Sequence, residues 1–262
     1  MNLPPISPDR FRVRRRIYLV RHGEVDYFDA SGRPLRTEDV PLNERGREQV
    51  TALARELGAV ALDRVVHSGL RRTAESAEIL VDDRDLRAES VDDLREISPG
   101  TLRDLEETTE IAGTTEADGG RPTFEAAFTG AMTRSIDRAT RFLGGETFGD
   151  FHDRVAPAFR ALLEDPSWRQ MLVVAHGGTN RVILATALGV ELAAIARLEQ
   201  DPACLNIIDV AEDSEWRDAC LVRLVNHTVH EAVKENLRLT TMEQIFLDYQ
   251  ERLAAARRDA GP

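Results

Sequence analysis

Short apolar runs that stop abruptly at a histidine and a glycine are the most distinctive pattern along the chain. Residues 17–20 read Ile-Tyr-Leu-Val and are followed by Arg-His-Gly, and residues 171–175 read Met-Leu-Val-Val-Ala and are followed by His-Gly-Gly. A brief apolar run bounded by glycine is typical of a buried β-strand. Further apolar runs are found at residues 65–66 and 221–225. We therefore predict a buried strand at each of these positions.

Amphipathic segments between the predicted strands indicate helices. Val50, Leu53 and Leu57 follow the i, i+3, i+7 spacing of one helix face, after a candidate cap at Asn43 and before a stop at Gly58. Similar patterning predicts further helices over residues 74–80, 124–142, 148–163, 182–189 and 242–256. Strands that alternate with helices favour an α/β fold in three layers (α/β/α), with a mostly parallel sheet covered by helices on both faces.

The chain of 262 residues has room for one or two domains, and a single α/β unit of this size is ordinary. We predict one domain over residues 1–262. Prolines near the start indicate an extended arm at residues 1–15, residues 97–150 are predicted to be an insertion, and residues 212–262 a C-terminal extension. Residues 104–118 carry acidic side chains and no basic one, as a solvated segment does.

The balance of charge is acidic. Lys and Arg number 34 against 46 Asp and Glu, which gives a formal net charge of −12. A field of this sign repels nucleic acid and anionic membranes, so we expect neither as a partner. An anionic ligand then needs a local cationic site. Lys234 is the only lysine, so arginine is the cation available almost everywhere.

The two cysteines, Cys204 and Cys220, are too few for a disulfide framework and lack the spacing of a metal site. The apolar run at residues 17–20 is too short for the core of a signal peptide, and no run reaches the ~18 apolar residues of a membrane span. We expect a cytoplasmic protein. The sequence leaves open whether the protein forms a homodimer.

His22 and His176 occupy the same predicted place, directly after a buried strand. Ligands of doubly wound sheets bind at the carboxyl ends of the strands, so the two imidazoles would face one crevice if the strands are neighbours. For either histidine alone, a strand that simply ends at the surface explains the pattern equally well. The pair, each followed by glycine, favours an anion site at the start of a helix.

Several short motifs follow one another along the chain. They are Arg21-His22-Gly23-Glu24, residues 39–46 (Asp-Val-Pro-Leu-Asn-Glu-Arg-Gly), residues 68–73 (Ser-Gly-Leu-Arg-Arg-Thr), residues 94–97 (Leu-Arg-Glu-Ile), residues 144–147 (Gly-Gly-Glu-Thr) and His176-Gly177. In this order they resemble the histidine phosphatase superfamily, in the branch that includes cofactor-dependent phosphoglycerate mutases and related phosphatases. The resemblance runs from about residue 17 to residue 189. It implies a phosphoglycerate mutase-like fold in which the insertion is a lid of helix and loop.

The resemblance also implies roles for individual residues. His22 would be the nucleophile that attacks phosphorus and becomes a transient phosphohistidine, which requires a neutral imidazole. Arg21 and Arg72 would bind the phosphoryl oxygens, and His176 and the backbone amide of Gly177 would complete the anion site. For Arg72, the pattern without the motif favours a solvent-facing helix residue.

The resemblance assigns the general acid and base to Glu96, which would protonate the leaving alkoxide and later activate water. A surface carboxylate is the alternative interpretation of Glu96. Asn43 and Glu24 are candidate substrate contacts. Asn43 stands where many members have Ser or Thr, and Phe28 replaces an asparagine often found six residues beyond the nucleophile, so substrate contacts near His22 depart from the family pattern.

Two histidines and a glutamate are also a candidate metal set, but two arginines in the same pocket would repel a cation, so no metal and no cofactor are predicted. Residues 97–150 contain no lysine, whereas the resemblance implies a lysine and paired arginines there in a mutase. We therefore expect a metal-independent phosphomonoester hydrolase that acts on a small phosphorylated metabolite. Mutase-type phosphoryl transfer and a catalytically silent binding or regulatory protein on the same scaffold stay open as alternatives.

Overall fold

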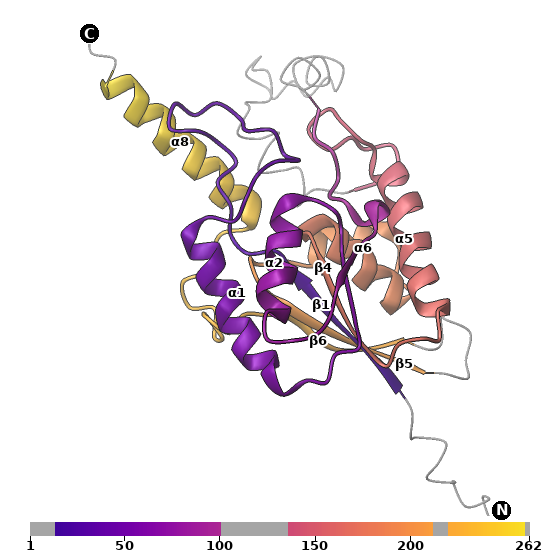
Figure 1. Ribbon diagram of the computed structural model, residues 1–262. Coiled ribbons are helices and arrows are strands. Elements are labelled where there is room, and N and C mark those ends of the chain that lie inside the picture. The colour runs from indigo at the N-terminus through magenta and orange to yellow at the C-terminus, as the bar shows by residue number, and fades with distance from the viewer. Residues whose placement is uncertain (1–13, 101–135, 212–219, 260–262) are drawn as a thin grey trace, which may run out of the picture.

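A computed structural model describes residues 14–100, 136–211 and 220–259 (Figure 1). Its centre is a six-stranded sheet in the order β3-β2-β4-β1-β5-β6. The strands are β1 (Arg14–Arg21), β2 (Arg64–His67), β3 (Ala88–Ser90), β4 (Gln170–Ala175), β5 (Leu205–Ala211) and β6 (Cys220–His227). The pairs β3–β2, β2–β4 and β4–β1 are parallel, and β5 is antiparallel to both of its neighbours, β1 and β6. The mostly parallel α/β sheet expected from the sequence is confirmed.

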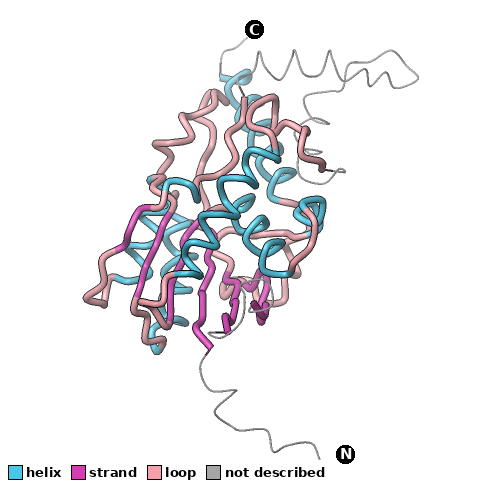
Figure 2. Tube along the Cα trace, turned by 90° about the vertical axis from the view of Figure 1, so that its right-hand side faces the viewer, coloured by secondary structure: helices cyan, strands magenta, loops and turns pink. Residues whose placement is uncertain are grey.

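Helices cover both faces of the sheet, as Figures 1 and 2 show from two directions. They are α1 (Glu44–Glu56), α2 (Arg71–Val81), α5 (Phe148–Glu164), α6 (Gly177–Leu188) and α8 (Thr241–Asp259), with short 3-10 helices at Leu57–Ala59, Asp92–Leu94 and Leu192–Arg197. Among the described helices, none is long and apolar enough to cross a lipid bilayer.

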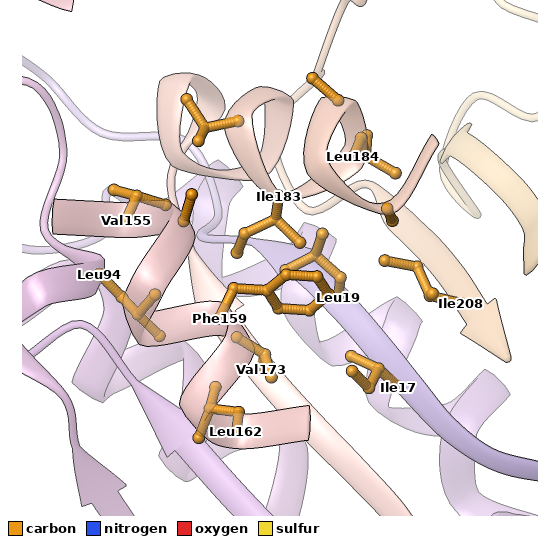
Figure 3. Packing of buried hydrophobic residues seen from close by; sticks show 14 of the residues in the cluster. Ile17, Leu19, Leu94, Val155, Phe159, Leu162, Val173, Ile183, Leu184 and Ile208 are labelled. Atoms are coloured by element: carbon orange, nitrogen blue, oxygen red, sulfur yellow. The ribbon is translucent and has the colours of Figure 1, made fainter. Parts of the chain in front are cut away.

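The alternation of side chains along β1 separates the two layers of helices. Ile17 and Leu19 pack in one cluster with apolar residues of α5 and α6, which Figure 3 shows. Tyr18 and Val20 point the other way and pack with apolar residues of α1 and α2. Because successive strand residues face opposite sides of a sheet, one short apolar run supplies both halves of the core.

Several elements differ from the sequence-based expectation. β3 and β5 were not predicted, and β1 begins at Arg14, within the expected arm at residues 1–15. Arg15 is buried over the Trp168 ring at 4.3 Å and donates to the carbonyls of Leu163 and Asp165. An arginine whose stem and head both find partners can occupy a buried strand position.

Three expectations concern the insertion and the extension. Residues 136–142 form a turn and an isolated bridge, not the end of the helix predicted over 124–142. The rest of that segment and the whole acidic stretch at 104–118 lie outside the described residues. The expected extension at residues 212–262 contains β6, so part of it belongs to the central sheet. Its last helix, α8, lies beyond the end of the sheet toward which β1 runs (Figure 1).

Candidate active site

The sheet places the two histidines side by side. β1 and β4 are neighbours, and Arg21 pairs with Ala175 at their carboxyl ends, so the next residue of each strand is a histidine. The centroids of the His22 and His176 rings lie 5.2 Å apart, with one ring edge toward the other face. Both side chains are buried. The expectation that the two imidazoles share one crevice agrees with this arrangement.

The protein fixes which nitrogen of His22 carries the hydrogen. Nδ1 lies 2.7 Å from the carbonyl oxygen of Gly23, and because a carbonyl only accepts, Nδ1 is the donor. Nε2 is then unprotonated, and Nε of Arg72 donates to it over 3.3 Å. Burial lowers the pKa of His22 well below its ordinary value, and the charges of Arg72 and Arg21 lower it further. The imidazole is therefore neutral, and the electron pair of Nε2 accepts from Arg72.

Two buried guanidinium groups act on His22 electrostatically, and one of them, Arg72, contacts this nitrogen. Arg72 is the second residue of α2 and also donates to the carbonyl of Thr37 over 2.5 Å. Arg21, the last residue of β1, donates from one terminal nitrogen to the carbonyl of Gln200 and to Oγ1 of Thr241. Among the described residues, nothing accepts from Nε of Arg21, although that atom is buried. A buried donor of this kind is suited to an anionic ligand.

A chain of hydroxyl groups orients His176. Thr73 donates from Oγ1 to the carbonyl of Leu70, so it accepts the hydrogen of Ser68 Oγ, 2.9 Å away. Ser68 therefore accepts from Nε2 of His176 over 2.6 Å. Burial lowers the pKa of His176 well below its ordinary value, with Arg72 and His22 as further causes, so Nδ1 carries no hydrogen. Within the described part of the chain, that buried Nδ1 has no hydrogen-bond partner.

The start of α6 lies beside the two arginines. The Gly177 backbone passes so close to Arg21 that a Cβ there would stand 3.6 Å from Nε. Its N–H is the first of α6, and helix geometry leaves it without an acceptor inside the helix. The next N–H, of Gly178, donates to Oε2 of Glu96 over 3.0 Å, and a Cβ on Gly178 would lie only 2.5 Å from Oε1. A side chain at Gly178 would therefore displace the carboxyl of Glu96 from the start of the helix.

Arg154 of α5 fixes the segment that carries Glu96. Its guanidinium donates to the backbone carbonyls of Arg95 and Glu96 over 2.7 and 2.9 Å, and it forms an ion pair with Glu146 over 2.8 Å. Glu146 also accepts from the backbone N–H of Ser98. These contacts tie the residues on both sides of Glu96 to α5, so its carboxyl is placed by the fold and is only half-buried.

A cavity of about 400 Å³ opens over these groups. Its polar floor is formed by Arg21, Arg72, Glu96, Gly177 and Gly178, and its described walls are largely apolar. The two arginines, the N-terminus of α6 and a carboxyl group thus meet in one pocket. This is where phosphate chemistry requires them, since positioned positive charge stabilises the transferred phosphoryl group. His22, which is bonded to Arg72, and His176 are buried next to these groups and do not themselves line the cavity.

Asn43 and Glu24 occupy a different place, because neither lines this cavity. Asn43 caps α1 by accepting from the N–H of Gly46 and donates from Nδ2 to Oε1 of Glu24 over 3.2 Å. A Cβ on Gly23 would lie 2.3 Å from the carbonyl oxygen of Gly46. The two side chains therefore join the loop after His22 to the start of α1, and we do not propose them as substrate contacts.

Comparison with known proteins agrees with this geometry. The family model described as histidine phosphatase superfamily (branch 1) matches residues 17–220. The chain belongs to the histidine phosphatase superfamily. The resemblance of its motifs to that family is thereby confirmed.

Relatives of this histidine phosphatase chain include both mutase and phosphatase names. The probable phosphoglycerate mutase GpmB of Salmonella paratyphi A is 30% identical over 203 residues, which cover 76% of this chain and 86% of the relative. A putative alpha-ribazole-5'-P phosphatase from Escherichia coli has a TM-score of 0.60 at 25% identity, covering 81% of this chain and 96% of that one. A mycobacterial glucosyl-3-phosphoglycerate phosphatase matches with a TM-score of 0.60 at 25% identity, over 81% and 99% of the two chains.

Sequence reasoning missed several residues of the histidine phosphatase site. Ser68 and Thr73 stand inside a quoted motif, so their positions were marked although their task was not. Nothing local marks Arg154 or Thr241, which reach the site from α5 and α8. Across residues 14–100, 136–211 and 220–259, no three His, Cys, Asp or Glu side chains gather in the way that metal ligands do.

Proposed function

We propose that this protein is a phosphomonoester hydrolase that uses His22 as its nucleophile and needs no metal ion. The observation that carries the proposal is the state of His22: a buried, neutral imidazole whose Nδ1 is bonded to a carbonyl and whose Nε2 electron pair lies beside Arg72. A nucleophile must present an electron pair toward the phosphorus atom, and this imidazole is oriented to do so.

In the first step, Nε2 of His22 attacks phosphorus as the bond from phosphorus to the ester oxygen breaks. The guanidinium groups of Arg21 and Arg72 and the Gly177 amide stabilise the phosphoryl oxygens during transfer, while the ring of His176, held by Ser68, lies against His22. The carboxyl of Glu96 gives its proton to the departing oxygen, so the leaving group departs as a neutral alcohol.

In the second step, water attacks the phosphorus atom of the phosphohistidine. Glu96, now a carboxylate, takes a proton from that water, the N–P bond breaks, and the electron pair returns to Nε2 of His22. Inorganic phosphate leaves, and both residues regain their starting states. The water thus replaces the alcohol at phosphorus, and no redox partner is needed.

The two alternatives have less support. A phosphoglycerate mutase must hold a second acidic group, but the other arginines that line the described cavity are paired with carboxylates, Arg95 with Asp92 and Arg181 with Glu199. In a catalytically silent binding protein, nothing requires the neutral His22 tautomer or the hydroxyl groups of Ser68 and Thr73 that orient His176. We therefore propose hydrolysis of a small phosphorylated metabolite, with water as the acceptor.

An ester panel assayed with a strong chelator present tests the proposal. We expect release of inorganic phosphate, and a loss of at least about a thousandfold in kcat for His22→Asn, because the nucleophile is removed. The matched control is His152→Asn, which changes a histidine of α5 that pairs with the exposed Asp153. Activity that disappears with chelator and returns with a divalent metal would contradict the proposal, as would transfer of the phosphoryl group to a second substrate hydroxyl rather than to water.

A further inference from the structure

Three segments far apart in the sequence form the walls of the active-site cavity. The loop after His22 contributes Tyr27, Phe28 and Leu35, and the helix α8 contributes Met242 and Ile245. The third group, on the two sides of the undescribed residues 101–135, consists of Ile97, Pro99, Phe142 and Leu143. Each segment presents apolar or aromatic side chains to the same space.

The wall made by the loop and α8 is held together by specific contacts. The rings of Phe28 and Tyr249 lie 5.0 Å apart. Arg252 of α8 donates to the carbonyl of Phe28 over 3.1 Å and forms an ion pair with Asp26 over 2.8 Å. Gly32, which has a positive φ of 79°, lies so close to Leu253 that a Cβ would stand 3.0 Å from its side chain. Figure 1 shows the loop running beside α8. The apolar wall is therefore a built part of the fold.

The same helix also contacts the phosphate end of the cavity. Thr241, the first residue of α8, accepts from Arg21 over 2.9 Å and lies 3.1 Å from Oε1 of Glu199. One turn further, Ile245 faces the cavity. A molecule whose phosphoryl group lies at Arg21 would thus extend along α8 past apolar side chains.

Charge in the walls argues against an acidic leaving group. Arg21 and Arg72 are assigned to the phosphoryl group. The remaining described cations of the lining, Arg95 and Arg181, form ion pairs with Asp92 over 3.2 Å and with Glu199 over 2.9 Å. Glu38 adds a negative charge to the lining. Among the described lining residues, a carboxylate on the leaving group would lose its hydration without gaining a cation that lacks an acidic partner, which costs free energy.

We infer that the substrates are phosphomonoesters with an apolar alkyl or aryl leaving group, seated between the loop at residues 27–35 and α8. This inference rests on the proposed phosphatase activity and names its substrate class. Burial of each methylene contributes about 0.8 kcal/mol, which is a factor of three to four in affinity or in kcat/KM. Selectivity would therefore grow steadily with the length of the leaving group until the cavity is filled.

A series of n-alkyl phosphates, from ethyl to hexyl, tests the inference, because their alcohols differ little in acidity. We expect kcat/KM to rise about three- to fourfold for each added methylene that enters the cavity. Hexyl phosphate should exceed glycerol 3-phosphate and 3-phosphoglycerate by more than about tenfold. A flat series, or a preference for either polar ester, would overturn the inference.

Substitutions on α8 test whether this helix causes the dependence of kcat/KM on chain length. Ile245→Asn places an amide in the apolar wall and should lower the ratio of kcat/KM for hexyl over ethyl phosphate by about tenfold. Leu247→Asn is the matched control, because Leu247 lies two residues further along the same helix, is 40% exposed and does not line the cavity. This control should leave the ratio unchanged. Equal ratios in the two variants would overturn the role given to α8.

Binding of n-alkylphosphonates separates this inference from the proposed function, because their C–P bond is not hydrolysed. Calorimetry should give an affinity that rises with chain length from methyl- to hexylphosphonate, by the same factor for each methylene. If no ester is hydrolysed, the proposed function fails. The phosphonate series still shows whether the cavity binds an apolar group attached to a phosphoryl group. An affinity that does not depend on chain length overturns the inference even if hydrolysis is observed.

Discussion

At the scale of single residues, the site holds two buried arginines whose described hydrogen-bond partners are uncharged. The partners of Arg21 and Arg72 are carbonyl oxygens, a hydroxyl group and an imidazole. Buried cations with neutral partners are costly, and an incoming phosphoryl dianion supplies the missing charge. Neutral imidazoles at His22 and His176 keep that cost down, because protonating either would add another buried cation.

Glu96→Gln should separate the two chemical steps. 4-Nitrophenolate is a stable anion that departs without a proton, whereas attack of water on the phosphohistidine still needs a base. With 4-nitrophenyl phosphate, the variant should release a rapid burst of about one equivalent of nitrophenolate and then turn over slowly, as stopped-flow absorbance would record. Ser98→Ala, at another residue that lines the cavity, serves as the control and should show no burst. Uniformly slow release without a burst would contradict the second role of Glu96.

Ser68→Ala should affect the site through His176. The substitution removes the oxygen that accepts from Nε2 of His176, so the proton is no longer fixed on that nitrogen. We expect the ring-nitrogen NMR signals of His176 to show a mixture of tautomers, and kcat to fall by about tenfold or more. Thr73→Val removes the hydroxyl group that accepts from Ser68, and it should cause a smaller change in the tautomers of His176 and a smaller loss of kcat. A wild-type tautomer in Ser68→Ala would show that the hydroxyl chain does not orient His176.

At the scale of elements, Arg154 joins α5 to the segment around Glu96. Arg154→Met removes its donors to the backbone carbonyls of that segment and its ion pair with Glu146. Misplacement of a catalytic group by about 1 Å costs up to about a hundredfold, so we expect kcat to fall by ten- to a hundredfold. Inhibition by inorganic phosphate should change little, because Arg21 and Arg72 are untouched.

Arg138→Met is the control for this change. It breaks an ion pair with Asp153 of α5 in which both side chains are more than half exposed, and such pairs contribute little. Melting temperatures of both variants would show that they fold. An equal loss of kcat in the two variants would contradict the positioning role of Arg154.

The elements also show which parts of the fold the sequence pattern could predict. β1 and β4 were predictable because an apolar run stops sharply at a histidine and a glycine. β5 was not, since Asn206 and Asp209 interrupt its apolar residues. Both are buried: Asn206 donates to the carbonyl of Leu19, and Asp209 is paired with Arg16 and Arg223. Partners that are distant in sequence make these polar strand residues tolerable, and no local pattern reveals them.

The candidate site divides in the same way. His22 and His176 follow predicted strands, so their meeting could be expected once the strands were taken as neighbours. The contacts of Thr241 and Arg154 depend on how α8 and α5 pack, which periodicity does not determine. Asn43 caps α1, as its position before the amphipathic segment predicted, and does not line the cavity, because the motif near the nucleophile includes residues that shape the loop as well as residues that line the cavity.

At the scale of the whole molecule, the two buried histidines link stability to pH. Their pKa values are lowered well below 6.5 in the folded protein, mainly by burial, and return to about 6.5 on unfolding. Below pH 6.5 the unfolded chain therefore binds more protons, so the free energy of unfolding falls as pH falls. Each histidine contributes up to about 1.4 kcal/mol per pH unit.

Urea unfolding at pH 7.5, 6.5 and 5.5 checks this dependence. The doubly substituted variant His22→Gln, His176→Gln should lose less stability than the wild type between pH 6.5 and 5.5, because its side chains do not titrate. Between pH 7.5 and 6.5 the two proteins should differ by only about a third as much, because the unfolded histidines are at most half protonated there. If the free energy of unfolding changed with pH by the same amount in the wild type and in the variant over the whole range, the neutral state of the two imidazoles would be contradicted.

Trapping of the phosphorylated enzyme tests the central claim most directly. The protein is mixed with a ³²P-labelled ester, quenched with alkali within milliseconds, and the labelled peptide is identified. The account predicts a label on His22 that survives alkali and is lost in acid, as an N–P bond requires, and that is absent from His22→Asn. Label on another residue, or full turnover by His22→Asn, would contradict it.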